Sequence, residues 1–219
     1  MSSLRVEISG RVALSGLLAC GRVPLVRTTS KAAEARERGR AAFLDAAERL
    51  VAAGASYSDV AIGELAAEAG FSRASFYAYF SDKRALAEAV AERFAVDLAA
   101  EVGDWLAGEG TDVRDTVLRA AGVFERHRGA VLLVSEAAAY DPEIRERWRA
   151  VHARFEQRIG EWIARHRPGL PPGVVAARAF ALTWSTQAVL VEHLSRTEAV
   201  DASVASAVTL LWGSALDAA

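Results

Sequence analysis

Apolar residues recur at helical spacing along nearly the whole chain, and this periodicity most constrains the fold. From Ala32 onward, apolar side chains return every three or four residues, as one face of an amphipathic helix requires. No segment alternates apolar and polar residues over enough length to indicate a β-strand. Abundant alanine and only 5 prolines also favour helices. The sequence therefore predicts an all-α fold.

Capping residues and helix breakers divide this pattern into successive helices. Asp141-Pro142-Glu143 is the strongest helix start, because Asp caps, Pro presets φ and Glu faces the positive end of the helix dipole. Ser72 is a second N-cap, Gly54 stands at a helix C-terminus, and Gly129 is expected to separate two helices. The predicted helices cover residues 34–53, 62–69, 73–80, 83–106, 111–128, 130–140, 142–166, 174–195 and 201–217.

Composition excludes several classes of protein. The chain has 219 residues, a net charge of −2 and 25% charged residues, which is typical of a soluble globular protein. No stretch approaches the roughly 18 uninterrupted apolar residues of a membrane span, so we expect no membrane partner. Cys20 is the single cysteine, which rules out an intrachain disulfide and fits a cytoplasmic location.

Catalytic and metal-binding motifs are not found in the sequence. It contains no nucleophile elbow, no phosphate-binding P-loop and no H-E-x-x-H zinc motif. His152 and Glu156 lie four residues apart on one predicted helix, an arrangement that is more often a structural contact than an acid–base pair. We therefore predict no enzymatic activity, no catalytic residues, no metal and no cofactor.

The first 31 residues do not share the helical pattern and are expected to form a poorly ordered leader. An apolar run from Val12 to Cys20 faintly resembles an export signal, but Ser15 and Gly16 interrupt it. A basic arm that follows phosphates is a third interpretation. Residues 32–90 and 91–219 then form two domains.

Two short helices joined by a glycine-containing turn, over residues 62–80, indicate a helix-turn-helix. On a helical wheel, Phe76, Tyr79 and Phe80 share the core-facing sector of the second helix, and Ala74 and Ala78 lie opposite. The outer side is therefore small and polar, as close approach to base edges requires. Arg73, Ser75 and Tyr77 supply hydrogen-bond donors, and the alanines can contact thymine methyl groups.

The segment Ile62-Gly63-Glu64-Leu65-Ala66-Ala67-Glu68-Ala69-Gly70-Phe71-Ser72-Arg73-Ala74-Ser75-Phe76-Tyr77-Ala78-Tyr79-Phe80-Ser81-Asp82-Lys83 resembles the DNA-binding domain of TetR-family bacterial repressors, as does Ala41–Leu50 before it. The likeness covers about fifty residues. The sequence is also similar to the EthR-like branch of that family at the Leu65-Ala66 pair, at Phe76-Tyr77-Ala78-Tyr79-Phe80, and at Trp148 and Trp212. In that branch the C-terminal domain encloses a long apolar tunnel.

The resemblance implies roles for individual residues. Tyr77 and Lys83 would touch DNA phosphates, Gly70 would serve the turn, and Arg84 adds a candidate phosphate contact. Ala61 stands where relatives carry a capping Ser or Thr, so either Ser58 or Asp59 caps instead or the cap is absent. The predicted DNA-binding residues are Arg40, Ala61, Gly70, Ser72, Arg73, Ala74, Ser75, Tyr77, Tyr79 and Lys83.

All five tryptophans lie in the predicted C-terminal domain. Large aromatics commonly just fill a helical core, but several on different helices can also line a cavity. The resemblance favours a cavity for a small lipophilic effector. The predicted ligand-binding residues are Trp105, Phe124, Trp148, Phe155, Thr183, Trp184, Thr186, Gln187 and Trp212.

The last two predicted helices carry more apolar surface than one core needs, which indicates a homodimer formed through them. The combined expectation is a repressor that binds a palindromic double-stranded DNA operator as a homodimer and is released by its effector. The alternatives are a helical small-molecule-binding protein or enzyme that binds no operator, and an adaptor that binds other proteins.

Overall fold

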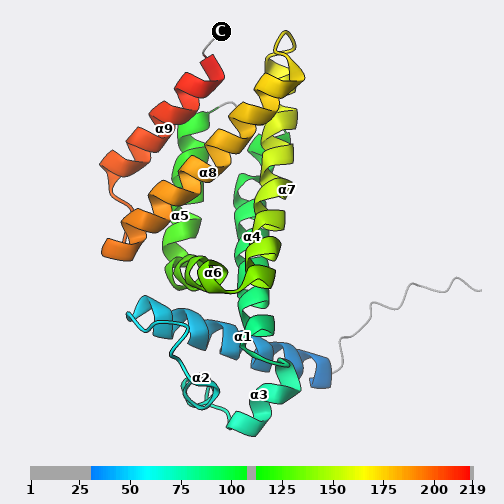
Figure 1. Cartoon of the computed structure of the whole chain (residues 1–219), viewed down its shortest axis with the longest axis vertical. Helices are drawn as coiled ribbons and strands as arrows, with labels where there is room; N and C mark the ends of the chain where they lie inside the picture. Colours follow the sequence, from blue (N-terminus) through cyan, green and yellow to red (C-terminus); the bar gives the residue numbers. More distant parts are fainter. Residues whose placement is uncertain (1–30, 108–111, 218–219) are drawn as a thin grey trace, which may run out of the picture.

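A computed structural model describes residues 31–107 and 112–217, and every regular element in these ranges is a helix, as predicted. The leader expected over residues 1–31 lies outside the described residues, apart from Lys31. The helices are α1 (Lys31–Ala52), α2 (Ile62–Glu68), α3 (Arg73–Tyr79), α4 (Lys83–Ala107), α5 (Val113–Arg126), α6 (Arg128–Tyr140), α7 (Pro142–His166), α8 (Pro172–Arg196) and α9 (Ala202–Asp217) (Figure 1).

The N-terminal unit is built around the ring of Phe43 on α1. This ring is fully buried and meets Phe76 of α3 edge-on, with 5.5 Å between the ring centroids. Leu65 and Ala66 close the same core from α2. Figure 1 shows α2 and α3 on one side of α1, at the end of the molecule opposite the bundle formed by the later helices.

Helix α4 joins the two parts, because it begins beside α3 and runs up into the bundle of α5 to α9 (Figure 1). A second core lies in that bundle, where Trp105 of α4 stacks on Trp162 of α7 at 4.5 Å and meets Trp212 of α9 edge-on at 5.4 Å. Buried aromatic rings thus account for much of the packing in both parts.

The expectation that Gly129 separates two helices is wrong. The break falls at His127, and Gly129 lies inside α6, where α6 crosses α1. A Cβ atom at position 129 would collide with the backbone carbonyl of Glu48. The glycine is therefore a close-approach position between two helix backbones rather than a helix breaker.

The start of α8 also differs from the expectation. Pro172 occupies the first helical position, with Pro171 as the N-cap, so the helix begins two residues before the predicted residue 174. A proline at this position costs nothing, because its missing N–H would have no partner inside the helix.

Helix α8 is long and apolar enough, by length and composition alone, to cross a membrane. The sequence did not indicate this helix as a possible membrane span, because charged and polar residues interrupt its apolar run. The helix packs against α6, α7 and α9, and only 22% of its most apolar stretch is buried. Helix α8 therefore exposes part of its apolar surface.

Candidate functional site

The turn between α2 and α3 has the hydrogen bonds of a Schellman motif. The amide of Phe71 donates to the Ala66 carbonyl at 2.8 Å, and the amide of Gly70 donates to the Ala67 carbonyl at 3.0 Å. Gly70 adopts φ +78°, a left-handed conformation that favours glycine. Ser72 caps α3, as predicted, by accepting from the Ser75 amide at 3.1 Å.

Helix α3 turns its small and polar side outward. Phe76 and Phe80 are buried, whereas Arg73, Ala74 and Ala78 are exposed. Tyr77 is 51% exposed, so its hydroxyl end can reach a partner. The prediction that this side of α3 faces solvent is confirmed.

Ser75 is half-buried, and its hydroxyl is 2.8 Å from that of Ser72. It therefore belongs to the cap of α3 as well as to the helix surface. A hydroxyl both donates and accepts, so Ser75 keeps hydrogen-bonding capacity for a further partner.

Two predicted DNA-binding residues are engaged with the N-terminal core. The Tyr79 ring packs between Phe43, at 5.4 Å, and Phe71, at 5.8 Å, and its hydroxyl lies against Gly39. The guanidinium of Arg40 lies 5.5 Å from the centre of the Phe80 ring. Both side chains thus brace α3 against α1.

Ala61 is the N-cap residue of α2, and no side chain caps this helix. Ser58 and Asp59 bond to each other at 3.2 Å instead of capping the helix. Of the two interpretations left open by the sequence, the absent cap is the one the structure has.

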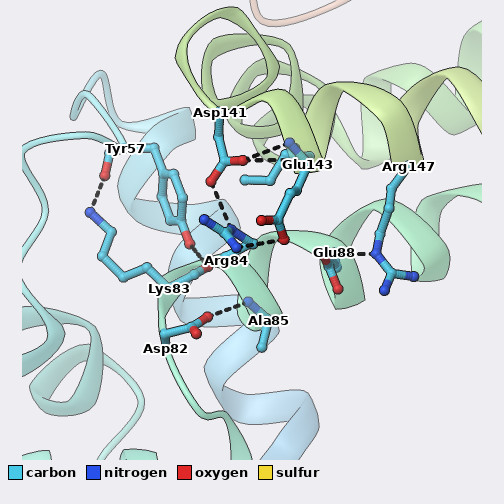
Figure 2. Close-up of polar contacts among 10 residues, drawn as sticks. Tyr57, Asp82, Lys83, Arg84, Ala85, Glu88, Asp141, Glu143 and Arg147 are labelled. Carbon is cyan, nitrogen blue, oxygen red and sulfur yellow. Dashed lines mark hydrogen bonds and ion pairs between the residues drawn. The ribbon is translucent and has the colours of Figure 1, made fainter.

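Lys83 points toward the loop before α2 (Figure 2). Its ammonium group donates to the carbonyls of Tyr57, Ser58, at 3.2 Å, and Val60, at 2.8 Å. Burial lowers the pKa of Lys83 from its ordinary value, although nearby carboxylates partly offset this. The side chain expected to meet a DNA phosphate therefore holds residues 57–60 against the first turn of α4.

Arg84 also has protein partners where the sequence suggested a phosphate. It donates to Asp141, the N-cap of α7, at 2.9 Å and to Glu143 at 2.6 Å (Figure 2). One turn further along, Glu88 of α4 pairs with Arg147 of α7 at 2.8 Å. The first two turns of α4 are thus attached to the start of α7.

Glu136 of α6 binds the same loop from the other side. Its carboxylate accepts from the Ser56 hydroxyl at 2.6 Å and from the amides of Tyr57 and Ser58, both at 3.0 Å. Burial alone would raise the pKa of Glu136, but these hydrogen bonds lower it below its ordinary value. We call Glu136, Arg84, Asp141 and Glu143, with the loop of residues 56–58, the interdomain contact.

A cavity lies in the C-terminal bundle, between α4, α5, α7, α8 and α9. It holds about 90 Å³ of space open to the centre of a water molecule, where a single water needs roughly 10–15 Å³. All the predicted ligand-binding residues line it except Trp184. Sequence reasoning missed ten lining residues: Phe94, Leu98, Val102, Val113, Thr116, Val117, Ala120, Val151, His152 and Ile159.

Trp184 lies behind the cavity wall instead of in it. Its ring stacks on His152, which does line the cavity, with 4.2 Å between centroids, and its indole N–H donates to Glu156 at 2.8 Å. His152 and Glu156 therefore make no contact with each other that resembles an acid–base pair. Both position Trp184.

No group of three or more His, Cys, Asp or Glu side chains is placed to hold a metal ion within residues 31–107 and 112–217. Two features of the described residues are suited to binding a partner noncovalently: the outer side of α3 and the cavity.

Residues 43–90 match the family model described as bacterial regulatory proteins, tetR family. Solved structures with a similar fold include FadR, a fatty acid degradation regulator from Bacillus halodurans, at 13% identity and a TM-score of 0.64, covering 82% of this chain and 95% of that one. A TetR-family regulator from Streptomyces coelicolor has 22% identity and a TM-score of 0.62, covering 82% and 95%.

PfmR, a TetR-family regulator from Thermus thermophilus, is similar at 18% identity with a TM-score of 0.61, covering 80% of this chain and 96% of that one. No curated protein sequence matches the chain. The likeness thus covers nearly the whole of each solved structure, and the TM-scores show a shared fold.

Proposed function

We propose that this chain, which carries the N-terminal domain and the fold of TetR-family regulators, is a cytoplasmic repressor that binds a palindromic operator as a homodimer. A small lipophilic effector in the C-terminal cavity would release it from DNA. The proposal makes the protein a regulator without enzymatic activity.

The observation that carries this proposal is the outward side of α3. Arg73 at the first turn can reach a guanine edge or a phosphate, and Tyr77, a half-exposed residue, can donate a hydrogen bond from its hydroxyl. Ala74 and Ala78 lie on the same exposed side, and their small side chains allow the helix backbone to approach base edges closely. Ordinary surface helices carry long charged side chains at such positions.

Exposed apolar residues on the last two helices support the homodimer. Phe180 on α8 is 56% exposed and Leu210 on α9 is 71% exposed, so both helices present large apolar side chains that a partner helix could cover. Pairing of α8 and α9 about a two-fold axis would set two copies of α3 on one face of the duplex. Successive major grooves on that face are about 34 Å apart.

The EthR-like branch remains part of the proposal, supported by the apolar, aromatic-lined cavity. Coupling would run through α4, which contributes Phe94, Leu98, Val102 and Trp105 to the cavity wall and begins beside α3. An effector that prefers a different angle of α4 would move α3 away from operator spacing. Such a ligand shifts the equilibrium only by its preference between the two arrangements.

Selection of bound fragments from bacterial genomic DNA tests the proposal. We expect the purified chain to enrich fragments that share an inverted repeat, and the Arg73→Ala and Tyr77→Ala variants to lose this enrichment without loss of helicity. Arg149→Ala, on the exposed surface of α7, is the matched control and should bind as the unmodified chain does. A folded protein that enriches no fragment would contradict operator binding and favour a helical small-molecule-binding protein.

A further inference from the structure

Among the residues that the structure describes, none that lines the cavity carries a charged side chain. Aromatic and aliphatic residues make up most of the cavity wall, and no Asp, Glu, Lys or Arg is among these described residues. An ionised ligand buried there would lose its hydration without gaining an opposite charge, which strongly disfavours binding.

Most polar groups of the wall are already bound within the protein. The Thr116 hydroxyl donates to the Asp112 carbonyl at 3.0 Å, and the Thr183 hydroxyl donates to the Ala179 carbonyl at 2.8 Å. Thr186 accepts from the indole N–H of Trp212 at 2.8 Å. Each of these three threonine hydroxyls therefore already has a hydrogen-bond partner within the protein.

His152 does not supply the missing charge. It is 5% exposed, and its Nδ1 lies 2.7 Å from the Trp148 carbonyl, where it donates. Burial lowers the pKa of His152 below its ordinary value, against smaller opposing contributions from that hydrogen bond and from Glu156. Because its pKa lies below the ordinary value of 6.5, the ring is neutral at neutral pH.

Two kinds of polar atom in the wall lack a partner within the described part of the chain. One is the side-chain oxygen Oε1 of Gln187, an acceptor, and the other is the indole N–H of Trp148 and of Trp105, which are donors. Buried polar atoms are nearly always hydrogen-bonded in folded proteins. A ligand that hydrogen-bonds to these atoms would therefore be favoured, and because each atom exposes less than 1 Å² of surface, its side chain must shift slightly toward the cavity to meet that ligand.

We propose that the cavity binds an uncharged molecule with a compact, ring-bearing apolar body and a polar group, such as a hydroxyl, that donates to Gln187 and accepts from Trp148. Carboxylates and phosphorylated molecules are excluded as ligands. That this molecule acts as an effector rests on the function proposed above, whereas its chemical class rests on the cavity alone.

Calorimetric titration of the purified full-length protein at neutral pH tests this class with three matched probes. Phenethyl alcohol, phenylacetate and ethylbenzene share a ring and differ in carrying a hydroxyl, a carboxylate or no polar group. We expect phenethyl alcohol to bind at least about tenfold more tightly than phenylacetate, since each tenfold in affinity corresponds to about 1.4 kcal/mol.

Gln187→Leu keeps the volume of the side chain and removes its acceptor. We expect it to weaken phenethyl alcohol binding about three- to tenfold and to leave ethylbenzene binding unchanged or tighter. Gln157→Leu, an exposed position on α7, makes the same chemical change outside the cavity and should alter neither. Trp148→Phe, which keeps a ring and loses the N–H, should weaken the alcohol selectively if Gln187→Leu fails to fold.

Equal affinity for phenylacetate and phenethyl alcohol, binding of none of the three probes, or an unchanged affinity in both cavity variants would overturn the proposed ligand class. The function proposed above fails separately. A probe that binds the cavity but leaves operator affinity unchanged would contradict the effector role and leave the ligand class intact.

Discussion

The guanidinium of Arg84, on the first turn of α4, donates to Asp141, the residue that caps α7, at 2.9 Å (Figure 2). Asp141 thereby serves two helices at once, because its other oxygen accepts from the Glu143 amide at 2.9 Å and from the Ile144 amide at 3.3 Å. A rotation of α4 that moves α3 must therefore break this contact, unless α7 moves together with α4.

Reversing the charge of Arg84 tests whether this contact holds the two parts together. Arg84→Glu places a carboxylate against Asp141 and Glu143, so we expect a lower melting temperature. Adding Glu143→Lys should restore most of the loss, as should about 1 M salt, where the screening length is about 3 Å. A melting temperature that neither rescue moves would contradict an electrostatic origin.

Removal of the Glu136 carboxylate should loosen the loop that it binds. Glu136→Ala leaves the amides of Tyr57 and Ser58 without their acceptor, and we expect a loss of about 1–3 kcal/mol in the free energy of unfolding. Amide hydrogen exchange should accelerate at residues 57 and 58. Unaltered exchange there would mean that the contact is not maintained in solution.

The same carboxylate gives this contact a pH dependence. Because its hydrogen bonds outweigh burial and lower the pKa of Glu136, the ionised form is favoured in the folded protein, and its contribution is present at neutral pH. The contribution is lost as pH falls through the lowered pKa. The stability difference between the unmodified chain and Glu136→Ala should therefore shrink in acid, as measured by urea unfolding at several pH values.

Two glycines offer a matched pair of substitutions. Gly129→Ala forces a Cβ into the Glu48 carbonyl and should destabilise the protein by about 3 kcal/mol, the upper end for overpacking. Gly122→Ala, inside α5, brings its Cβ only to within 3.5 Å of the flexible end of Arg126, and should gain about 0.5–1 kcal/mol in stability. Equal effects in urea unfolding would contradict the close crossing of α1 and α6.

The proposed dimer predicts a change of mass in solution. Phe180→Glu or Leu210→Glu would bury a charge in the interface formed by α8 and α9, and either should yield a monomer at micromolar concentration in analytical ultracentrifugation. Val96→Glu on α4, where the valine is 57% exposed, is the control. A monomeric unmodified chain would contradict the homodimer.

The sequence predicted the helices well because their ends carry local signals. Ser72 and the Asp141-Pro142 pair mark N-termini through bonds within a few residues, and both were read correctly. Gly129 was misread because its role depends on Glu48, some eighty positions earlier, which no local pattern shows.

The candidate site residues show the same contrast between local signals, which a sequence displays, and contacts with distant elements, which it does not. The periodicity of α3 was enough to assign Tyr77 to the exposed side, since exposure follows from the wheel. The resemblance assigned Lys83 to a DNA phosphate and added Arg84 as a candidate, whereas the partners that both have in the structure lie on other elements, which no local pattern indicates. His152 was dismissed with Glu156, although its position one turn after Trp148 placed both on the cavity-facing side.

Ala74→Glu tests the central claim, that the outer side of α3 contacts DNA, most directly. The exposed alanine lies in the first turn of α3, where a carboxylate suits the helix dipole, so folding should be unaffected. Ala150→Glu, at an exposed position on α7, adds the same charge elsewhere. In fluorescence anisotropy with a selected operator duplex, we expect Ala74→Glu to abolish binding and Ala150→Glu to retain it. Full operator affinity in a folded Ala74→Glu protein would contradict the claim.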